Sequence, residues 1–218
     1  MNWDEIKILV VFAAYLIGSI PTAVWFGKIF YKIDLREHGS GNAGATNALR
    51  VFGNKAGAIV LVIDALKGVA AVSLISFFPD TFDSRIFYVL YQLLLGVAAL
   101  IGHVFPVFAG FRGGKGIATL AGIGIAMFPI PVLICLGVFL IAFLPTRYVS
   151  VGSLSAGLAF PITVILLAKD ITIPEIVFAS LVTVFVTITH RKNIKRLIGG
   201  TENKLMFGNK GLANANAK

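Results

Sequence analysis

The chain has 218 residues, of which 57% are hydrophobic and 13% are charged, and its mean hydropathy is +0.90. This small share of polar residues excludes a soluble globular protein of the same size and indicates an integral membrane protein. The formal net charge of +9 does not indicate a nucleic-acid-binding protein, because the basic residues alternate with apolar runs of membrane length.

The first apolar run covers residues 8–30 and is long enough to span the hydrocarbon core of a bilayer. It is too long for a cleaved signal peptide, its start is not basic, and no small-residue cleavage site follows it cleanly. Gly18, Ser19 and Pro21 lie within it. A helix broken there leaves polar backbone groups that only packed protein or a water-filled cavity can satisfy. The sequence predicts either a helix break near a functional site or a simple kink.

The first polar interruption is the stretch 39–47, which is rich in glycine and small polar residues and is closed by Arg50. Its glycines leave backbone N–H groups accessible, and its side chains add two hydroxyls and two amides, which together suit an oxyanion or phosphate. The alternative is a flexible connector between two helices, which rarely carries so many hydrogen-bonding side chains. The candidate binding residues here are Gly39, Ser40, Gly41, Asn42, Thr46, Asn47 and Arg50.

A second apolar run, residues 56–78, contains two charged residues, Asp64 and Lys67. Their spacing of three places both on one face of a helix. Charges at membrane depth are costly unless they are paired or hydrated. We therefore expect an ion pair that faces the interior of the bundle, with a place lining the binding site as the alternative.

A polar turn and a third apolar run, residues 86–101, lead to a second glycine-rich stretch, residues 111–116. Its glycines allow a backbone to approach an anion, Lys115 adds a point charge, and a helix starting at Ile117 would present its N-terminus. It is not a Walker loop, because Gly116 stands where that motif has Ser or Thr. The candidate anion-binding residues are Gly113, Gly114, Lys115 and Gly116. His103 is either a further candidate or a hydrogen-bonded residue at a helix end.

The run from residue 117 to 144 is long for one membrane crossing and short for two, and Pro129 and Pro131 interrupt it. If the chain turns there and crosses twice, 15 of the 19 Lys and Arg residues share the face that carries both glycine-rich stretches. If it crosses once, the seven basic residues after His190 move to the other face, against the positive-inside tendency. We therefore predict seven crossings, with the N-terminus outside and the C-terminus inside. Cys135 lies in this run and, as the single cysteine, excludes an intrachain disulfide.

Two further apolar runs, residues 151–168 and 176–189, complete the predicted bundle, and the first of them has the Gly, Ser and Ala content that close helix packing requires. The basic stretch that follows is typical of a helix end attracted to lipid headgroups, but His190 and Asn193 are spaced to project together on one face. Residues 1–207 are expected to form one membrane domain, and the low-complexity tail 208–218 is expected to be disordered. Topology and headgroup contacts are the expected roles of Arg36, Arg147, Arg191 and Arg196.

Three polar clusters on one predicted face are rich in hydrogen-bond donors, with Glu202 as almost the only acidic member. A glycine-lined pocket of this kind is suited to a ligand with more than one negative oxygen. Neither a metal ion nor another cofactor is expected, since the three histidines are scattered and lack a Cys or carboxylate at ligand spacing. Ser40 lies in no Gly-x-Ser-x-Gly frame, which argues against a serine nucleophile.

Most of these polar positions fall into recognisable motifs. The matching positions are Gly18 to Pro21, Gly39 to Asn42, Thr46, Asn47, Arg50, Gly102 to Pro106, Gly113 to Thr119, His190, Asn193 and Glu202. They resemble the motifs of the bacterial acyl-phosphate-dependent glycerol-3-phosphate acyltransferases. The similarity covers nearly the whole chain up to about Glu202, and the first two motifs are long enough to be specific.

The resemblance implies an all-α, seven-helix enzyme of the bacterial inner membrane with a cytoplasmic active site. Such an enzyme transfers a fatty acyl group from acyl phosphate to the 1-hydroxyl of glycerol 3-phosphate, giving lysophosphatidic acid and phosphate, the first step of phospholipid synthesis. No His-x-x-x-x-Asp motif starts at any of the three histidines, which fits a donor other than acyl-CoA. Because acyl phosphate is already an activated anhydride, we expect direct transfer without an acyl-enzyme. The substrate's own phosphate is one candidate for the general base.

By the same resemblance, the first motif holds the acyl phosphate through Ser40, Thr46 and Arg50, and Lys115 binds phosphate as well. His190 and Asn193 would orient glycerol 3-phosphate or polarise the acyl carbonyl, and Glu202 belongs to the same motif. Ser150 is a further binding candidate, with an ordinary helix N-cap as the alternative.

Two other function classes remain open. A transporter of a phosphorylated metabolite would explain broken helices and buried charges, but its polar groups should lie near the midplane, and no inverted repeat is visible. A purely structural membrane protein would leave both glycine-rich stretches unexplained. The expected partners are therefore the two substrates and membrane lipid, with no nucleic acid and no obligate protein partner.

Overall fold

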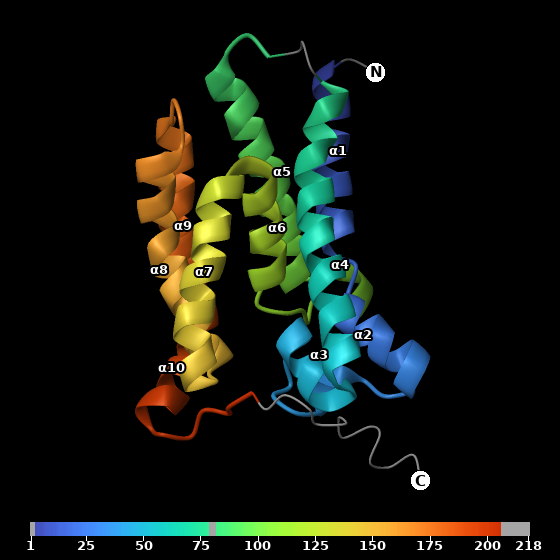
Figure 1. Cartoon of the computed structure of the whole chain (residues 1–218). Coiled ribbons are helices and arrows are strands. Elements are labelled where there is room, and N and C mark those ends of the chain that lie inside the picture. The colour runs from blue at the N-terminus through green and yellow to red at the C-terminus, as the bar shows by residue number, and fades with distance from the viewer. Residues whose placement is uncertain (1–2, 79–81, 206–218) are drawn as a thin grey trace. The chain divides into compact units, whose positions relative to one another are not determined.

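The computed structural model of the chain describes residues 3–78 and 82–205 (Figure 1), and in these ranges the regular structure is helical, with no strand. The predicted disordered tail, 208–218, lies outside the described residues. The elements are α1 (Trp3–Gly18), α2 (Thr22–Phe26), η1 (Gly27–Tyr31), η2 (Leu35–Glu37), α3 (Ala45–Phe52), α4 (Asn54–Ser73), η3 (Leu74–Phe77), α5 (Arg85–Val104), η4 (Val107–Ala109), α6 (Ile117–Met127), α7 (Pro129–Thr146), α8 (Val149–Leu167), α9 (Ile173–Thr189) and α10 (Arg191–Ile198).

Each of the seven predicted apolar runs forms a helix. Four segments are long and apolar enough to cross a membrane, and the count among the described residues rises to six if each of two bent helix pairs is one span. The remaining run forms α6, whose 11 residues extend about 16 Å, well short of a hydrocarbon core of about 30 Å. The predicted interruption between 117 and 144 is confirmed, since α6 ends at Met127 and α7 begins at Pro129, whereas the reversal of direction there stays a prediction. The count of seven crossings stays a prediction.

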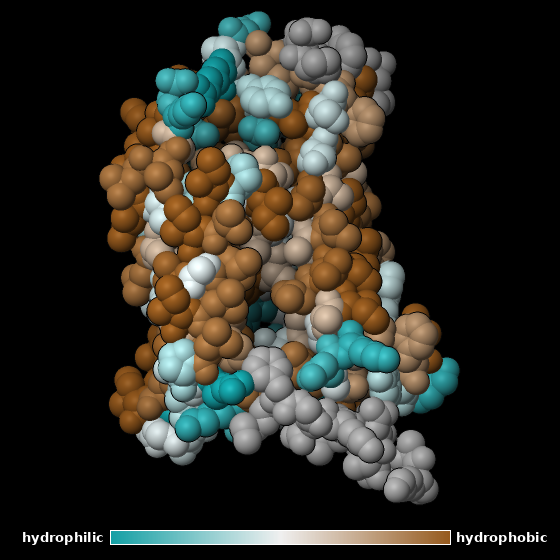
Figure 2. Space-filling model, viewed as in Figure 1, coloured by the Kyte–Doolittle hydropathy of each residue, from teal (hydrophilic) through white to brown (hydrophobic). Residues whose placement is uncertain are grey.

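The surface of the helices is that of a membrane protein. On the face shown in Figure 2, hydrophobic residues cover the helices and hydrophilic residues gather toward the helix ends. Large apolar side chains on several helices are more exposed than buried, among them Ile8, Leu133, Ile141 and Leu166. A soluble protein does not leave so many large apolar side chains in water. The protein is an all-helical integral membrane protein.

The chain divides into two compact units, one of residues up to Ala126 and the other starting at Met127. The prediction of a single domain over 1–207 therefore stays open. In the first unit, α1 packs against α4 and α5, and α3 packs against α4. The helices approach closely at glycines: a Cβ on Gly18 would overlap the carbonyl of Ala99, and a Cβ on Gly122 would overlap that of Ala65. Such small-residue contacts are the usual means of packing membrane helices.

The predicted helix break and the predicted ion pair prove to be one feature. α1 and α2 are separated by three residues and bent by 43°. Lys67 Nζ lies 2.8 Å from Asp64 Oδ1 and donates to the carbonyl of Ile20 at 3.0 Å, within the break. Thr22, the first residue of α2, donates to the same Asp64 oxygen at 2.9 Å. The buried pair thus satisfies polar groups that the break exposes, as membrane burial requires.

In the second unit, α8 packs against both α7 and α9. Close packing of α8, predicted from its small residues, is confirmed: Gly157 lies against Val186, and its carbonyl accepts a hydrogen bond from Thr183 at 2.6 Å. α9 begins with a capping box between Thr172 and Glu175 and is followed by α10 at an angle of 59°.

Candidate functional site

The first glycine-rich loop, residues 39–44, connects η2 to α3 at the end of the first unit away from the start of α1 (Figure 1). Gly39 and Gly41 have φ angles of 61° and 71°, a left-handed conformation that favours glycine. A Cβ on Gly39 would overlap Oδ1 of Asn47. The backbone path of this loop therefore depends on its glycines.

Asn47, on α3, fixes the shape of the loop from beneath. Its Oδ1 accepts a hydrogen bond from the backbone N–H of Ser40 at 2.9 Å. Its Nδ2 donates to the carbonyls of Leu35 and His38, at 3.2 and 2.9 Å. The side chain is 1% exposed, so its amide is committed to the loop. Substrate contact by Asn47 stays a prediction, whereas its role in shaping the loop is shown.

The other predicted residues of this region lie nearer to solvent. Ser40 and Gly41 are exposed, and Asn42 is half-buried. Thr46 and Arg50 are half-buried on α3, four residues apart and therefore on the same face of the helix. These side chains can present two hydroxyls, an amide and a guanidinium from one short segment.

The second glycine-rich loop, residues 110–116, folds back on the end of α5. The N–H of Gly113 donates to the carbonyl of Val104 at 3.1 Å, and that of Gly114 to the carbonyl of His103 at 3.2 Å. A Cβ on Gly114 would overlap the ring of His103 and would lie 3.0 Å from the carbonyl oxygen of Ala43, in the first loop. The two glycine-rich loops are therefore in contact, although about 70 residues separate them in the sequence.

The end of the second loop leads directly into α6. Gly116 has a φ of 77°, and Ile117 begins the helix. Lys115, which precedes Gly116, is half-buried. The loop, a lysine and a helix N-terminus thus come together as the sequence predicted, an arrangement suited to anion binding.

His103 lies beneath the second loop and is 6% exposed. Its Nδ1 is 3.2 Å from the hydroxyl of Thr119 on α6 and 3.7 Å from Asp64 Oδ1. The structure therefore shows the hydrogen-bonded helix-end residue that was one alternative, and it extends the buried polar network of Asp64 to the base of the loop. Direct contact of His103 with a substrate stays a prediction.

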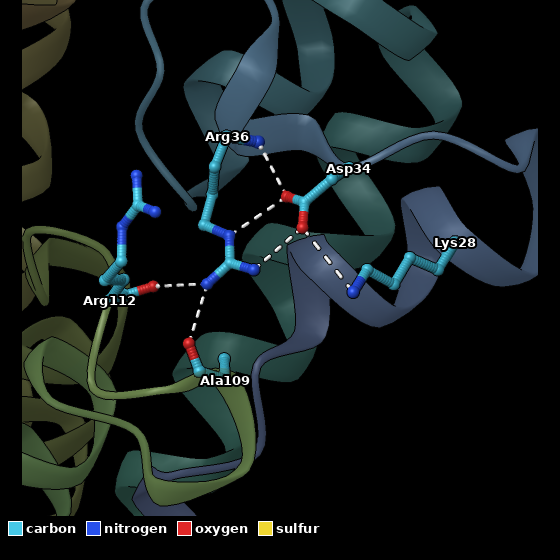
Figure 3. Close-up of polar contacts among 5 residues, drawn as sticks. All are labelled: Lys28, Asp34, Arg36, Ala109 and Arg112. Carbon is cyan, nitrogen blue, oxygen red and sulfur yellow. Dashed lines mark hydrogen bonds and ion pairs between the residues drawn. The ribbon is translucent and has the colours of Figure 1, made fainter.

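Arg36 joins the second loop to the segment before the first (Figure 3). Its guanidinium binds the carboxylate of Asp34 through two hydrogen bonds, and its Nη1 donates to the carbonyl of Ala109 at 2.7 Å. The Arg36 guanidinium holds the pKa of Asp34 well below its usual range, against the opposing effect of burial. The Arg36 side chain is 16% exposed and bonded within the protein, which does not fit the expected headgroup contact, and its role in topology stays a prediction.

In the second unit, Glu202 is the centre of a separate cluster. Its Oε1 accepts hydrogen bonds from the hydroxyl of Ser150 at 2.8 Å and from the amide of Asn193 at 2.6 Å. Its Oε2 accepts one from Nε of Arg196 at 2.7 Å. Burial alone would raise the pKa of Glu202, but the bonds from Asn193, Arg196 and Ser150 outweigh it, so the pKa is lowered. Arg196, for which topology and headgroup contacts were expected, is bonded within this cluster while its side chain stays 35% exposed.

The surroundings of Ser150 and His190 in the second unit bear on their expected roles. Ser150 is not a helix N-cap, because α8 begins at Val149 with Tyr148 in the cap position. His190 is 3% exposed, and its Nδ1 lies 2.8 Å from the carbonyl oxygen of Val186. A carbonyl only accepts hydrogen bonds, so Nδ1 of His190 carries a proton.

The structure thus forms two groups of predicted residues, one in each unit. The first unit holds both glycine-rich loops, Thr46, Asn47, Arg50 and His103, and the second holds Ser150, His190, Asn193 and Glu202. Among the described residues, no group of three or more His, Cys, Asp or Glu side chains could hold a metal ion. Sequence reasoning missed Asp34 and the structural role of Arg36; the one available signal was a carboxylate two residues before an arginine at the start of the first motif.

Comparison with known proteins agrees with these features. The model of the family described as glycerol-3-phosphate acyltransferase matches residues 8–200. The glycerol-3-phosphate acyltransferase of Chlorobaculum tepidum is 44% identical, over 92% of this chain and 97% of that protein. That of Chlorobaculum parvum is 43% identical, over 91% of this chain and 96% of the relative.

Two solved structures have the same fold. A crystal structure of PlsY (YgiH), an integral membrane glycerol 3-phosphate acyltransferase in its glycerol 3-phosphate form, is 35% identical and has a TM-score of 0.79, covering 92% of this chain and 96% of that one. The lysophosphatidic acid form of the same enzyme is 34% identical, with a TM-score of 0.78 and coverage of 92% and 95%. The family match, the relatives and the shared fold extend over nearly all of the chain, which belongs to the glycerol-3-phosphate acyltransferase family.

Proposed function

We propose that the protein transfers a fatty acyl group from acyl phosphate to the 1-hydroxyl of glycerol 3-phosphate. The products are lysophosphatidic acid and inorganic phosphate. The observation that carries this proposal is the contact between the two glycine-rich loops at Ala43 and Gly114. Two adjacent loops rich in hydrogen-bond donors suit a reaction in which both substrates carry a phosphate group. The forms in which PlsY was solved, with glycerol 3-phosphate and with lysophosphatidic acid, support the acceptor and the product.

The first unit supplies anion binding in this proposal. Acyl phosphate is held by the first loop and α3, and phosphate is also bound by the second loop and the start of α6. The residues assigned to these contacts are Gly39, Ser40, Asn42, Thr46, Arg50, Lys115 and Gly116. Gly41, Gly113 and Gly114 are assigned to the shape of the loops, because their N–H groups donate to the carbonyls of His38, Val104 and His103. Asn47 and His103 support the two loops from beneath, which is consistent with their burial.

The second unit supplies side chains that are held in fixed orientations. Glu202 fixes the amide of Asn193 and the hydroxyl of Ser150 by the hydrogen bonds that it accepts. With its Nδ1 proton committed to Val186, His190 in its neutral form can accept a hydrogen bond through Nε2. In this proposal His190 and Asn193 orient glycerol 3-phosphate or polarise the acyl carbonyl, and neither takes the hydroxyl proton.

The chemistry is direct transfer. The 1-oxygen of glycerol 3-phosphate attacks the acyl carbon, the bond from that carbon to the phosphate oxygen breaks, and the hydroxyl proton passes to a phosphate oxygen. Because the donor is already an anhydride, the protein contributes mainly by placing the two substrates and by stabilising negative charge with donors that are already in position. Neither an acyl-enzyme nor a metal or cofactor enters this proposal.

The site is assigned to the cytoplasmic side of the bacterial inner membrane, with the N-terminus outside. This orientation is supported by the basic residues, most of which share the predicted face with both loops.

Detergent-purified protein incubated with glycerol 3-phosphate and either palmitoyl phosphate or palmitoyl-CoA tests the donor. The expected result is lysophosphatidic acid and phosphate from palmitoyl phosphate alone, with most of the activity lost in Lys115→Ala. Equal turnover of palmitoyl-CoA would refute the donor assignment.

Rapid quenching and mass spectrometry test direct transfer: an acylated Ser40 that forms and decays at the rate of turnover would refute it.

A further inference from the structure

The ion pair of Asp34 and Arg36 lies outside the residues assigned to substrate binding, yet it connects both loops (Figure 3). Arg36 Nε donates to Asp34 Oδ1 at 3.0 Å and Nη2 donates to Oδ2 at 2.7 Å. This two-point contact fixes the plane of the guanidinium. Nη1 is thereby directed to both ends of the second loop's first turn: it donates at 2.7 Å to the carbonyl of Ala109, the last residue of η4 before the loop, and at 3.4 Å to the carbonyl of Arg112 within the loop.

Both ends of this connection are close to the proposed phosphate-binding segments. Arg36 lies in η2, three residues before Gly39, and η2 is itself held by the bond from Asn47 to the carbonyl of Leu35. At the other end, Arg112 immediately precedes Gly113. A short and constrained piece of backbone therefore links each loop to the guanidinium.

The pair is built differently from an ordinary surface ion pair. The side chains of Asp34 and Arg36 are 15% and 16% exposed, whereas that of Lys28, whose Nζ lies 3.5 Å from Asp34 Oδ2, is 56% exposed. Exposed pairs of the latter kind contribute little. Only an arginine has enough donors in one plane to bind a carboxylate at two points and carbonyl oxygens at the same time.

We propose that Asp34 and Arg36 are positioning residues that hold the two glycine-rich loops at the spacing that catalysis requires. The inference rests on the proposed function of the loops in binding the two phosphate-bearing substrates. Neither side chain is assigned a contact with substrate. Their effect arises because displacement of binding groups by about 1 Å costs roughly 100-fold in rate.

The test compares Arg36→Gln, Arg36→Lys and Asp34→Asn with Lys28→Gln as the matched control. Lys28→Gln removes a positive charge beside the same carboxylate, from a side chain that is mostly exposed. Turnover constants and KM for both substrates are measured on the purified full chain, together with thermal unfolding and direct binding of glycerol 3-phosphate. We expect kcat/KM to fall about 100-fold in Arg36→Gln and about 10-fold in Arg36→Lys, which keeps the charge but loses the planar fork.

The remaining variants sharpen the assignment. Lys28→Gln is expected to stay within about twofold of the wild type, as for other exposed pairs. The double variant of Asp34→Asn and Arg36→Gln is expected to be no worse than Arg36→Gln alone, because the two residues act as a unit. If Arg36→Gln does not fold, Arg36→Lys and Asp34→Asn carry the test, since each preserves part of the contact.

Several results would overturn the inference. A folded Arg36→Gln variant with kcat/KM within about twofold of the wild type would do so, and so would a loss of activity that only follows the loss of folded protein. A wild type that turns over no substrate refutes the proposed function instead. In that case the binding measurement still decides the positioning role, because unchanged affinity for glycerol 3-phosphate in Arg36→Gln would refute it.

Discussion

Asn47 in the first unit and Glu202 in the second are buried side chains that each make three hydrogen bonds, but with different kinds of partner. In the first unit, Asn47 makes all three of its hydrogen bonds to backbone groups of the segment 35–40. In the second, Glu202 accepts all three of its hydrogen bonds from side chains. The first arrangement specifies the path of a backbone, and the second specifies the orientation of functional groups. The two sites should therefore fail in different ways.

The largest effect is expected from removal of the carboxylate in the second unit. Glu202→Ala leaves three donors without their acceptor at once, and we expect it to lower the free energy of unfolding by about 3 kcal/mol. Thermal or denaturant unfolding of the purified protein measures this. Arg196→Gln is the control: the Arg196 side chain is 35% exposed, so this variant should lower the free energy of unfolding much less. Equal destabilisation by the two variants would show that Glu202 is not the organising residue.

The next largest effect is expected in the first unit, where Gly114→Ala adds a methyl group at the contact of the two loops and should lower activity. In Gly114→Ala the added Cβ overlaps the ring of His103 and presses on the carbonyl of Ala43. The loops must move apart, and we expect kcat/KM to fall about 100-fold with little change in the second unit. Gly110→Ala is the matched control, because Gly110 is in the same loop with a φ of 63° but has no atom within 4 Å of the added Cβ. If Gly110→Ala is equally inactive, the loss does not depend on the contact of Gly114 with Ala43 and His103, and any added methyl group in this loop is harmful.

Asn47→Asp tests the hydrogen bonds that shape the first loop, because it leaves the size of the side chain almost unchanged. Asn47→Asp keeps the acceptor for the N–H of Ser40 but loses both donors and faces two carbonyl oxygens with a carboxylate. We expect about 2 kcal/mol of destabilisation and a higher KM for a phosphate-bearing substrate. Kinetics and unfolding on the same preparation check both. A variant with normal KM would mean that the loop keeps its shape without these bonds.

The sequence predicted the features that local chemistry determines. The apolar runs, the break near Pro21, the two glycine-rich loops and the Asp64 and Lys67 pair are each visible within a few residues. The contact of Arg36 is not, because its acceptors are backbone carbonyls 73 and 76 residues away, which no side-chain pattern marks. Ser150 and Glu202 are likewise 52 residues apart, so spacing alone could not pair them. The sequence therefore identified the loops but not the contacts that hold them.

The smallest effect is expected from a fall in pH, which should remove the stabilisation by Glu202 and by Asp34 at different pH values. The pKa of Asp34 is lowered chiefly by the Arg36 bond, whereas the pKa of Glu202 is lowered by three hydrogen bonds that must first outweigh burial. A carboxyl with a lowered folded-state pKa binds fewer protons in the folded state, so its stabilisation is present above the unfolded pKa of about 4 and is lost as the pH falls through the folded value. Unfolding followed from pH 7 downward in wild type, Glu202→Gln and Asp34→Asn isolates each contribution. We expect the advantage of the wild type over Glu202→Gln to decline first, and its advantage over Asp34→Asn to persist to lower pH. The opposite order would mean that the Arg36 contact is the weaker of the two.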